Sequence, residues 1–142
     1  MLSENIIKKF GVAIDDRILL RNPPPGVREQ LLEILPPGVV LLEASGKAPL
    51  DLVLWWLQEL AGLTDALADL AQSIRPDGAV WLLIAKKKYA AQRGLRFSWQ
   101  QMQAAALETD LVDNTVASFS ETDYGTRFVI RREHRHRYRG AA

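Results

Sequence analysis

The chain has 142 residues, of which 48% are hydrophobic and 25% are charged, and its formal net charge is +1. These values are close to those of average globular domains, so they exclude a disordered, collagenous or low-complexity chain. With no cysteine in the sequence, disulfide scaffolds, thiolate zinc sites and thiol nucleophiles are excluded as well. The length fits one domain with its own hydrophobic core.

The sequence pattern does not indicate membrane insertion or export. Residues 1–5 lack the charged and apolar regions of a signal peptide. The longest strongly apolar run, residues 52–57, is too short to span a bilayer. We therefore expect a cytoplasmic protein without a membrane partner.

Charge is distributed unevenly along the chain. Residues 1–70 contain six Lys and Arg against ten Asp and Glu, whereas residues 71–142 contain 12 against seven. Six of the cations lie between Arg127 and Arg139. We expect a single domain over residues 1–133 and a basic, flexible tail over residues 134–142. Such a tail either binds phosphate or is a solvated terminus.

In residues 1–57, apolar side chains at helical spacing alternate with short, continuous apolar runs. Two proline-rich turns, residues 22–26 and 36–38, separate these segments. The pattern predicts, in order, a helix at 2–10 with Ser3 as its cap, a strand at 17–21, a helix at 27–35 and strands at 39–43 and 50–57. The last of these strands is almost continuously apolar, which is typical of a strand covered on both faces.

The second half of the chain continues the alternation and then changes to two strands in succession. The pattern predicts a helix at 59–74 ended by a turn at 75–78, a strand at 79–84, a helix at 99–109 capped by Ser98, and strands at 115–120 and 127–132 joined by a turn at 121–126. Alternating strands and helices favour a mainly parallel sheet with helices on both faces. We therefore expect strand order 2-1-3-4, with the C-terminal antiparallel hairpin extending the sheet beyond the fourth strand.

Three segments carry a resemblance to a known family: residues 77–87, 111–120 and 127–129. They resemble a family of small bacterial proteins catalogued as a domain of unknown function, which is itself similar to a shortened class I methyltransferase. The resemblance covers residues 5–132 and departs at Ala85, where the family pattern has proline. It implies a three-layer, Rossmann-like α/β fold. Against the methyltransferase plan, one strand and its crossover helix are missing between Glu43 and Leu50.

Cofactor contacts in such a fold are expected at the carboxyl ends of the strands, where Asn22, Gly26, Glu43 and Trp55 would line one crevice. Glu43 ends the second strand, the position at which an acid binds ribose hydroxyls. The first turn, however, contains three prolines, which lack N–H donors, and so favours a rigid connection over a cofactor loop. Trp55 and its neighbour Trp56 point to opposite faces of a strand, and either both pack under helices or one stacks on a base.

A second candidate site is cationic. Lys86, Lys87, Lys88 and Arg93 follow the fourth strand and form either a solvated loop or an anion contact beside the crevice. His134 and His136 lie among arginines without a third ligand, so we expect no metal site. Asp113, Glu121 and Asp123 flank the hairpin and act as general bases only if a substrate pocket reaches them.

These patterns favour a non-catalytic binding or interaction protein with a degenerate cofactor crevice and no cofactor. One alternative is an S-adenosylmethionine-dependent methyltransferase in which the proline turn replaces the glycine loop. Another is an anion- or nucleic-acid-binding protein that uses Lys86–Lys88 and the arginine-rich tail. A protein partner or a second copy of the chain is open in each case.

Overall fold

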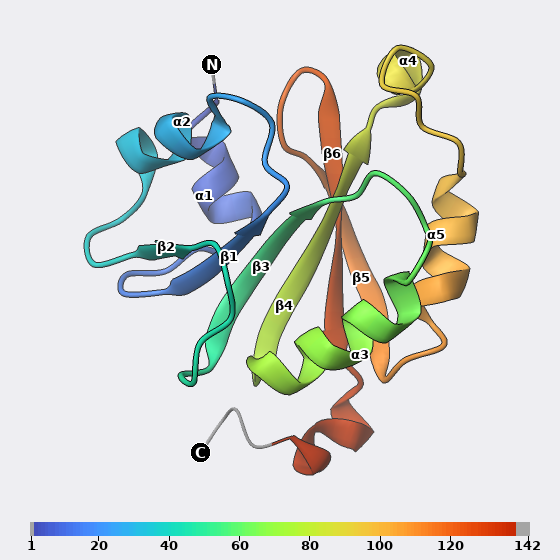
Figure 1. The fold of residues 1–142 in the computed structure, drawn as a ribbon. Helices are drawn as coiled ribbons and strands as arrows, with labels where there is room; N and C mark the ends of the chain where they lie inside the picture. Colours follow the sequence, from blue (N-terminus) through green and yellow to red (C-terminus); the bar gives the residue numbers. More distant parts are fainter. Residues whose placement is uncertain (1, 139–142) are drawn as a thin grey trace.

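The structure, a computed structural model, describes residues 2–138 and is built on a six-stranded sheet (Figure 1). The strand order is β2-β1-β3-β4-β6-β5. The strands are β1 (Arg17–Arg21), β2 (Val40–Leu42), β3 (Leu50–Trp56), β4 (Ile74–Ala85), β5 (Leu111–Ser118) and β6 (Asp123–Ile130). β2, β1, β3 and β4 are parallel, and β6 is antiparallel to both of its neighbours. The predicted α/β class, strand order and C-terminal hairpin are thus confirmed, and the last strand lies between β4 and β5.

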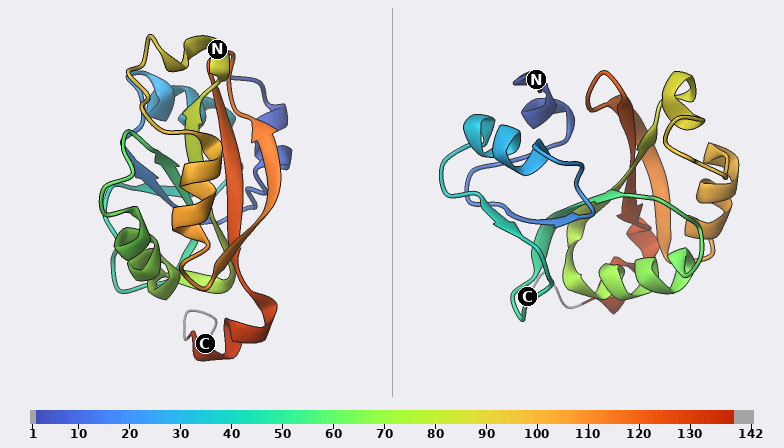
Figure 2. Two further views of the ribbon diagram at one scale, coloured as in Figure 1. Left: turned by 90° about the vertical axis from the view of Figure 1, so that its right-hand side faces the viewer. Right: turned by 45° about the horizontal axis from the view of Figure 1, so that its top comes forward.

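Helices cover both faces of the sheet and complete three layers (Figure 2). They are α1 (Asn5–Lys9), α2 (Val27–Ile34), α3 (Leu63–Ser73), α4 (Lys87–Ala90), α5 (Trp99–Ala106) and the 3-10 helix η1 (Arg132–Arg137). Apolar side chains of α1 and α2 pack on one face, and those of α3 and α5 pack on the other. Ser98 caps α5 in a capping box with Gln101, as its position in the sequence predicts.

Strand β3 contributes side chains to both hydrophobic clusters of the core, one on each face of the sheet. Trp55 joins the cluster under α3 and α5, whereas Trp56 joins the cluster under α1 and α2. Both side chains are buried, and the expectation that they point to opposite faces is confirmed. Burial of each large apolar side chain contributes about 1.5–3 kcal/mol, so this strand fixes the two helical layers to one another.

The expected boundary between α3 and β4 is wrong. The helix starts at Leu63, after Gly62 adopts a left-handed conformation (φ 72°), and β4 begins at Ile74, directly after the helix. Residues 75–78, expected as a turn, form a bulged part of the strand, where pairing steps from Leu50↔Ile74 to Leu52↔Ala79. Contacts with Asp51 hold this segment, because Arg75 Nε lies 3.0 Å from its carboxylate and Gly78 lies against its carbonyl oxygen.

The expected hairpin boundaries are also wrong. The structure extends β5 back to Leu111 and starts β6 at Asp123, so the turn occupies residues 119–122. Gly125, expected within the turn, lies inside the sheet opposite Leu83. A Cβ atom there would be 2.9 Å from Trp81 Cε3 and 3.0 Å from Phe10 Cε2. This glycine therefore makes room for two aromatic rings and does not turn the chain.

The connection between β2 and β3 contains neither a helix nor a strand. Residues 43–49 are almost all exposed and link two parallel strands that lie on either side of β1. A crossover helix is usual between parallel strands of one sheet. Its absence here agrees with the expected loss of a strand and a helix between Glu43 and Leu50.

The beginning of the basic C-terminal segment packs on the domain. Tyr138 Oη donates a 2.6 Å hydrogen bond to Asp110 Oδ2, and His134 Nδ1 lies 2.9 Å from Asp110 Oδ1. The Arg135 side chain donates to the carbonyl oxygen of Ile130. Residues 134–138 of the segment expected to be a flexible tail thus contact the domain, and residues 139–142 lie outside the described residues.

We expect Gly125→Ala to lower the free energy of unfolding by about 1–3 kcal/mol, because the added methyl overpacks the rings of Phe10 and Trp81. Urea denaturation measures the loss. Gly46→Ala is the matched control, since a Cβ at that exposed position meets only Arg17 Nη2 at 3.9 Å. Equal stabilities of the two variants would contradict the packing role of Gly125.

We expect Asp110→Asn to lower the pKa of Tyr138, which burial and the Asp110 carboxylate raise from 10.0 to about 12. Part of the elevation remains in the variant, because burial is its largest cause. Because folding raises the pKa of Tyr138, protonated Tyr138 favours the folded protein over the unfolded chain. This contribution to stability is fully present below pH 10, the pKa in the unfolded chain, and is lost as the pH rises through about 12. Phenolate absorbance measures the titration, with Asp113→Asn as the control. An unchanged tyrosine titration in Asp110→Asn would contradict the contact.

Candidate functional site

The carboxyl ends of the parallel strands meet at one end of the molecule (Figure 1). Ligands of open α/β sheets bind at this edge, beside the point where the strand order reverses. Here the reversal lies between β1 and β3. The connections that follow β1, β2, β3 and β4 form this edge, together with the β5–β6 turn, because β6 runs antiparallel to β4. Three hollows and a small pit open among them. One hollow, of about 290 Å³, contains none of the expected site residues and is lined by Gln58, Glu59, Leu60, Gly94, Arg96, Phe97 and Gln101.

The first cavity, which we call the β1–β2 hollow, has a volume of about 300 Å³. Its lining residues are Leu20, Arg21, Asn22, Pro23, Arg28 and Glu43. The structure thus brings together Asn22 and Glu43, two of the four expected cofactor residues. Asn22 leaves β1 in a left-handed conformation (φ 56°), which turns the chain away from the sheet.

The other two expected cofactor residues do not line this hollow. Gly26 precedes α2 as its N-cap, with φ 85°. Trp55 is buried, and the Arg21 guanidinium lies over its ring, 4.1 Å from the centroid. The Arg21 guanidinium thus occupies one face of the Trp55 indole.

Sequence reasoning missed two charged residues of the hollow, Arg21 and Arg28. Arg21 ends β1 and Arg28 is the second residue of α2, so the two flank the proline turn. The Nη1 atom of Arg28 is buried and lacks a hydrogen-bond partner. A positive charge in the first turn of a helix is unfavourable, because the N-terminal end of the helix dipole is also positive. An arginine at that position of a predicted helix is therefore unusual, and this could have identified Arg28 from the sequence.

The connection between β1 and α2 does not form a backbone cradle. Pro23, Pro24 and Pro25 have no N–H group to donate. The N–H of Val27 donates to the Pro24 carbonyl oxygen at 3.1 Å, within the turn itself. A Cβ atom at Gly26 would make only an ordinary contact, 3.6 Å from Gln30 Nε2, so no close backbone approach requires glycine there. The turn thus lacks the N–H groups with which glycine-rich loops hold nucleotide cofactors.

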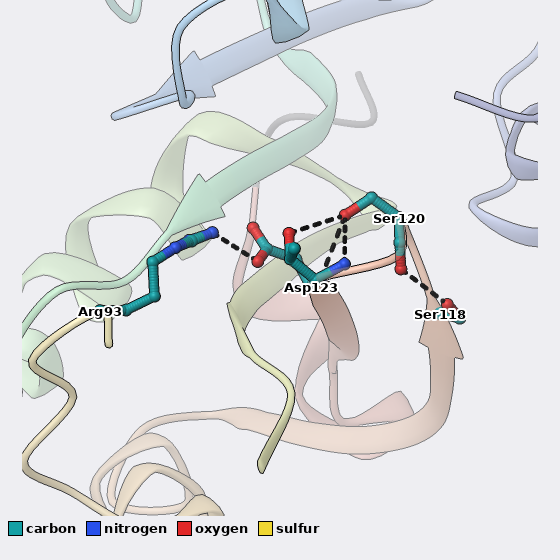
Figure 3. Close-up of polar contacts among 5 residues, drawn as sticks. Arg93, Ser118, Ser120 and Asp123 are labelled. Atoms are coloured by element: carbon teal, nitrogen blue, oxygen red, sulfur yellow. Dashed lines mark hydrogen bonds and ion pairs between the residues drawn. The ribbon is translucent and has the colours of Figure 1, made fainter. Parts of the chain in front are cut away.

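The second cavity, which we call the hairpin hollow, has a volume of about 240 Å³. It is lined by Leu2, Pro24, Val27, Gln30, Arg93, Phe119, Ser120, Glu121, Thr122 and Asp123. The Asp123 carboxylate is only 3% exposed and pairs with Arg93 Nη2 at 2.5 Å (Figure 3). Ser120 Oγ accepts hydrogen bonds from the N–H groups of Thr122 and Asp123, which holds the turn closed.

Between the ends of β3 and β4 lies a pit of about 30 Å³, which Trp56, Pro24 and Arg93 help to line. That volume accommodates about one water molecule. The Nε1 atom of Trp56 is buried and has no hydrogen-bond partner. The space between the ends of β3 and β4 is therefore small.

Two of the four expected anion-binding residues already have partners within the chain. Lys86 Nζ donates to Ser118 Oγ at 2.8 Å, and Arg93 pairs with Asp123. Lys87 and Lys88 are exposed on α4. The basic helix η1 follows β6 and lies at the opposite end of the molecule from α4 (Figure 1). The lysines and the basic tail therefore do not combine into one surface over the described residues.

The remaining titratable candidates make local contacts. Asp113 accepts hydrogen bonds from Gln103, and Glu121 accepts one from Tyr89. Hydrogen bonding by Tyr138 is the largest cause that lowers the pKa of Asp110, the partner of His134. Within residues 2–138, no group of three or more His, Asp or Glu side chains is placed to hold a metal ion. No helix in this range is both long and apolar enough to cross a bilayer.

Several solved structures with a similar fold are methyltransferases. An S-adenosylmethionine-dependent methyltransferase from Aquifex aeolicus matches with a TM-score of 0.64 and 13% identity, over 90% of this chain and 89% of that chain. One from Clostridium acetobutylicum matches with a TM-score of 0.58 and 9% identity, over 89% and 88%. A complex of the Trm112 methyltransferase activator with a methyltransferase from Haloferax volcanii matches with a TM-score of 0.59 and 12% identity, over 84% and 83%. At these identities the similarity establishes the fold alone.

The family is established by sequence. Residues 26–132, the greater part of the chain, match the family described as "Protein of unknown function (DUF3052)", so the chain belongs to that family. No curated protein matches the chain. The resemblance to a domain of unknown function with a methyltransferase-like fold is thereby confirmed.

We expect Arg93→Gln to lower the free energy of unfolding by about 1–3 kcal/mol, because it leaves the buried Asp123 carboxylate without its cation. Thermal denaturation measures the change. Arg96→Gln, at an exposed position on the same connection, is expected to stay within about 0.5 kcal/mol of the parent.

The double variant Arg93→Gln, Asp123→Asn tests whether the pair itself is responsible. The double change is expected to lower the free energy of unfolding by less than the sum of the two single changes. Each single change leaves one charged side chain unpaired, whereas the double change leaves none. Strictly additive losses would show that the two side chains act independently.

Proposed function

We propose that this protein is a non-catalytic binding domain, which combines a methyltransferase-like fold with a crevice that does not hold the methyltransferase cofactor. The observation that carries this proposal is the turn Pro23-Pro24-Pro25 at the end of β1. A glycine loop at that position supplies backbone N–H groups, and three prolines supply none.

The space at the edge of the sheet supports the same proposal. Ligand pockets generally measure about 300–1,000 Å³ and enclose most of their ligand. The pit between β3 and β4 has only about 30 Å³, and the β1–β2 hollow, with about 300 Å³, is at the lower limit. The two spaces have separate linings, so an extended adenosyl cofactor would have to displace side chains to reach across them.

Charge gives a further argument. S-adenosylmethionine carries a sulfonium cation, and the charged residues that line the β1–β2 hollow are two arginines, Arg21 and Arg28, and one acid, Glu43. Like charges at close range disfavour binding, most strongly where water is partly excluded. The hollow is therefore better suited to an anion than to the methyl donor.

A second candidate function is an S-adenosylmethionine-dependent methyltransferase with an unusual cofactor loop. It is favoured by Glu43, which follows β2 and lines the same hollow as Asn22. A carboxylate at the end of the second strand is the group that accepts hydrogen bonds from ribose hydroxyls in nucleotide-binding sheets.

We expect S-adenosylmethionine and S-adenosylhomocysteine to leave the thermal midpoint of the protein unchanged. A cofactor at 100 times its dissociation constant would add about 2.7 kcal/mol of stability, which corresponds to about 5–10 °C. Differential scanning fluorimetry with each compound measures the shift. A shift that disappears in Glu43→Ala would contradict the proposal and assign the hollow to the methyltransferase cofactor.

A further inference from the structure

An ion pair forms one wall of the hairpin hollow. Arg93 and Asp123 both line this hollow, and both also line the pit between β3 and β4, so the pair borders the two spaces. The side chains are in direct contact, with Nη2 of Arg93 2.5 Å from Oδ1 of Asp123 (Figure 3). Opposite charges thus lie side by side in the wall of one cavity.

The pair leaves part of each charged group free. Within residues 2–138, Oδ2 of Asp123 and the Nε and Nη1 atoms of Arg93 have no hydrogen-bond or ion-pair partner. The Arg93 side chain is 37% exposed. The fully buried polar atoms without a partner in this part of the chain belong to other residues, so Asp123 Oδ2 is in contact with the space that its side chain lines. One carboxylate oxygen and the N–H groups of one guanidinium are therefore available to a ligand.

These free atoms are complementary to a zwitterion. A carboxylate oxygen accepts hydrogen bonds from an ammonium group, and a guanidinium donates hydrogen bonds to a carboxylate. An α-amino acid carries both groups on one carbon atom, so they can contact Asp123 and Arg93 together. A buried ion pair adds little to stability compared with apolar packing, and its place in a cavity wall therefore favours a role in binding.

The rest of the hollow fits the side chain of such a ligand. Leu2, Val27 and Phe119 are buried and give the hollow an apolar wall. The volume of about 240 Å³ is below the range of about 300–1,000 Å³ that drug-sized ligands occupy, so the ligand is a smaller molecule. Glu121 lines the same hollow and disfavours an acidic ligand side chain. The lining therefore favours a small molecule with an apolar side chain.

We infer that the hairpin hollow binds a free α-amino acid with an apolar side chain. The ammonium group of the ligand contacts Asp123, its carboxylate contacts Arg93, and its side chain lies against Val27 and Phe119. This inference rests on the proposed function, because it names a ligand class for a domain that binds without catalysis. The hairpin hollow and the β1–β2 hollow share no lining residue, so the inference does not depend on what the β1–β2 hollow holds.

Isothermal titration calorimetry of the full chain tests the inference with L-leucine and L-phenylalanine. Each amino acid is compared with the amine that lacks the carboxylate and the acid that lacks the ammonium group. These are 3-methylbutylamine and 4-methylpentanoate for leucine, and phenethylamine and 3-phenylpropanoate for phenylalanine. We expect at least one of the amino acids to bind, and its two fragments to bind at least about 10-fold more weakly, because each fragment loses one charge-assisted contact.

Variants of the ion pair test its contact with the ligand. Asp123→Asn and Arg93→Lys are each expected to raise the dissociation constant about 10-fold or more. Arg93→Lys loses the planar guanidinium but keeps a cation beside the buried carboxylate, so the stability of the fold is largely retained. Asp113→Asn and Arg96→Lys are the matched controls outside the hollow, and each is expected to change the constant less than about twofold.

A further variant tests the cavity without altering the ion pair. Gln30 lines the hollow from α2, and Gln30→Phe places a larger side chain there, so we expect binding to be lost. Glu29→Phe, at the exposed neighbouring position outside the lining, is the control and is expected to bind as the parent does. Thermal denaturation of each variant shows whether it is folded.

Three results would overturn the inference. They are no binding of either amino acid with a dissociation constant below about 1 mM, a fragment that binds as tightly as its amino acid, and binding by Gln30→Phe equal to that by Glu29→Phe. 5′-Methylthioadenosine tests the proposed function separately, because it carries the adenosyl group without an amino-acid group. Its binding would contradict the proposed function and leave the inference intact, whereas a failure of both amino acids to bind would overturn only the inference.

Discussion

The buried indole of Trp81 is the contact on which the arrangement of the layers depends. Trp81 lies in the middle of β4, is fully buried, and donates a 3.2 Å hydrogen bond from Nε1 to the carbonyl oxygen of Phe10. The Phe10 ring packs on it with centroids 4.0 Å apart, and Gly125 of β6 leaves space for both rings. An indole N–H buried without a partner is costly, so the end of α1 has to remain where its carbonyl can accept this bond.

The position of α1 in turn determines where the candidate site lies. Ile6 and Phe10 of the α1 segment belong to the same hydrophobic cluster as Val27 and Leu31 of α2, so the two helices share one core layer. The proline turn joins the end of β1, which carries Arg21, to the first turn of α2, which carries Arg28. The residues that line the hollow are thus positioned by the packing of α1 and α2 in the core.

Local sequence patterns predicted the fold where local and tertiary preferences agree. The apolar runs of β1, β3 and β4 identify buried strands, and their spacing gives the parallel order. Prediction failed at residues 75–78 and at Gly125, where proline, aspartate and glycine are typical of turns but pairing with β3 and the rings of Phe10 and Trp81 decides the conformation. At the site, topology alone places Asn22 and Glu43 at one edge. Arg21 and Arg28 were missed because a search for cationic clusters favours consecutive residues such as Lys86–Lys88.

The position of β6 also constrains how the chain reaches its native state. β6 is the last strand in sequence, yet it lies between β4 and β5, so neither of those strands pairs with the other. Until residues 123–130 have been synthesised, the edge of β4 that pairs with β6 has no partner strand, and its backbone groups are open to pairing with other chains. The four parallel strands all precede β6 in the sequence, and β6 takes the position between β4 and β5. A truncation within β6 would therefore leave the edges of both β4 and β5 without a partner strand and expose the chain to aggregation.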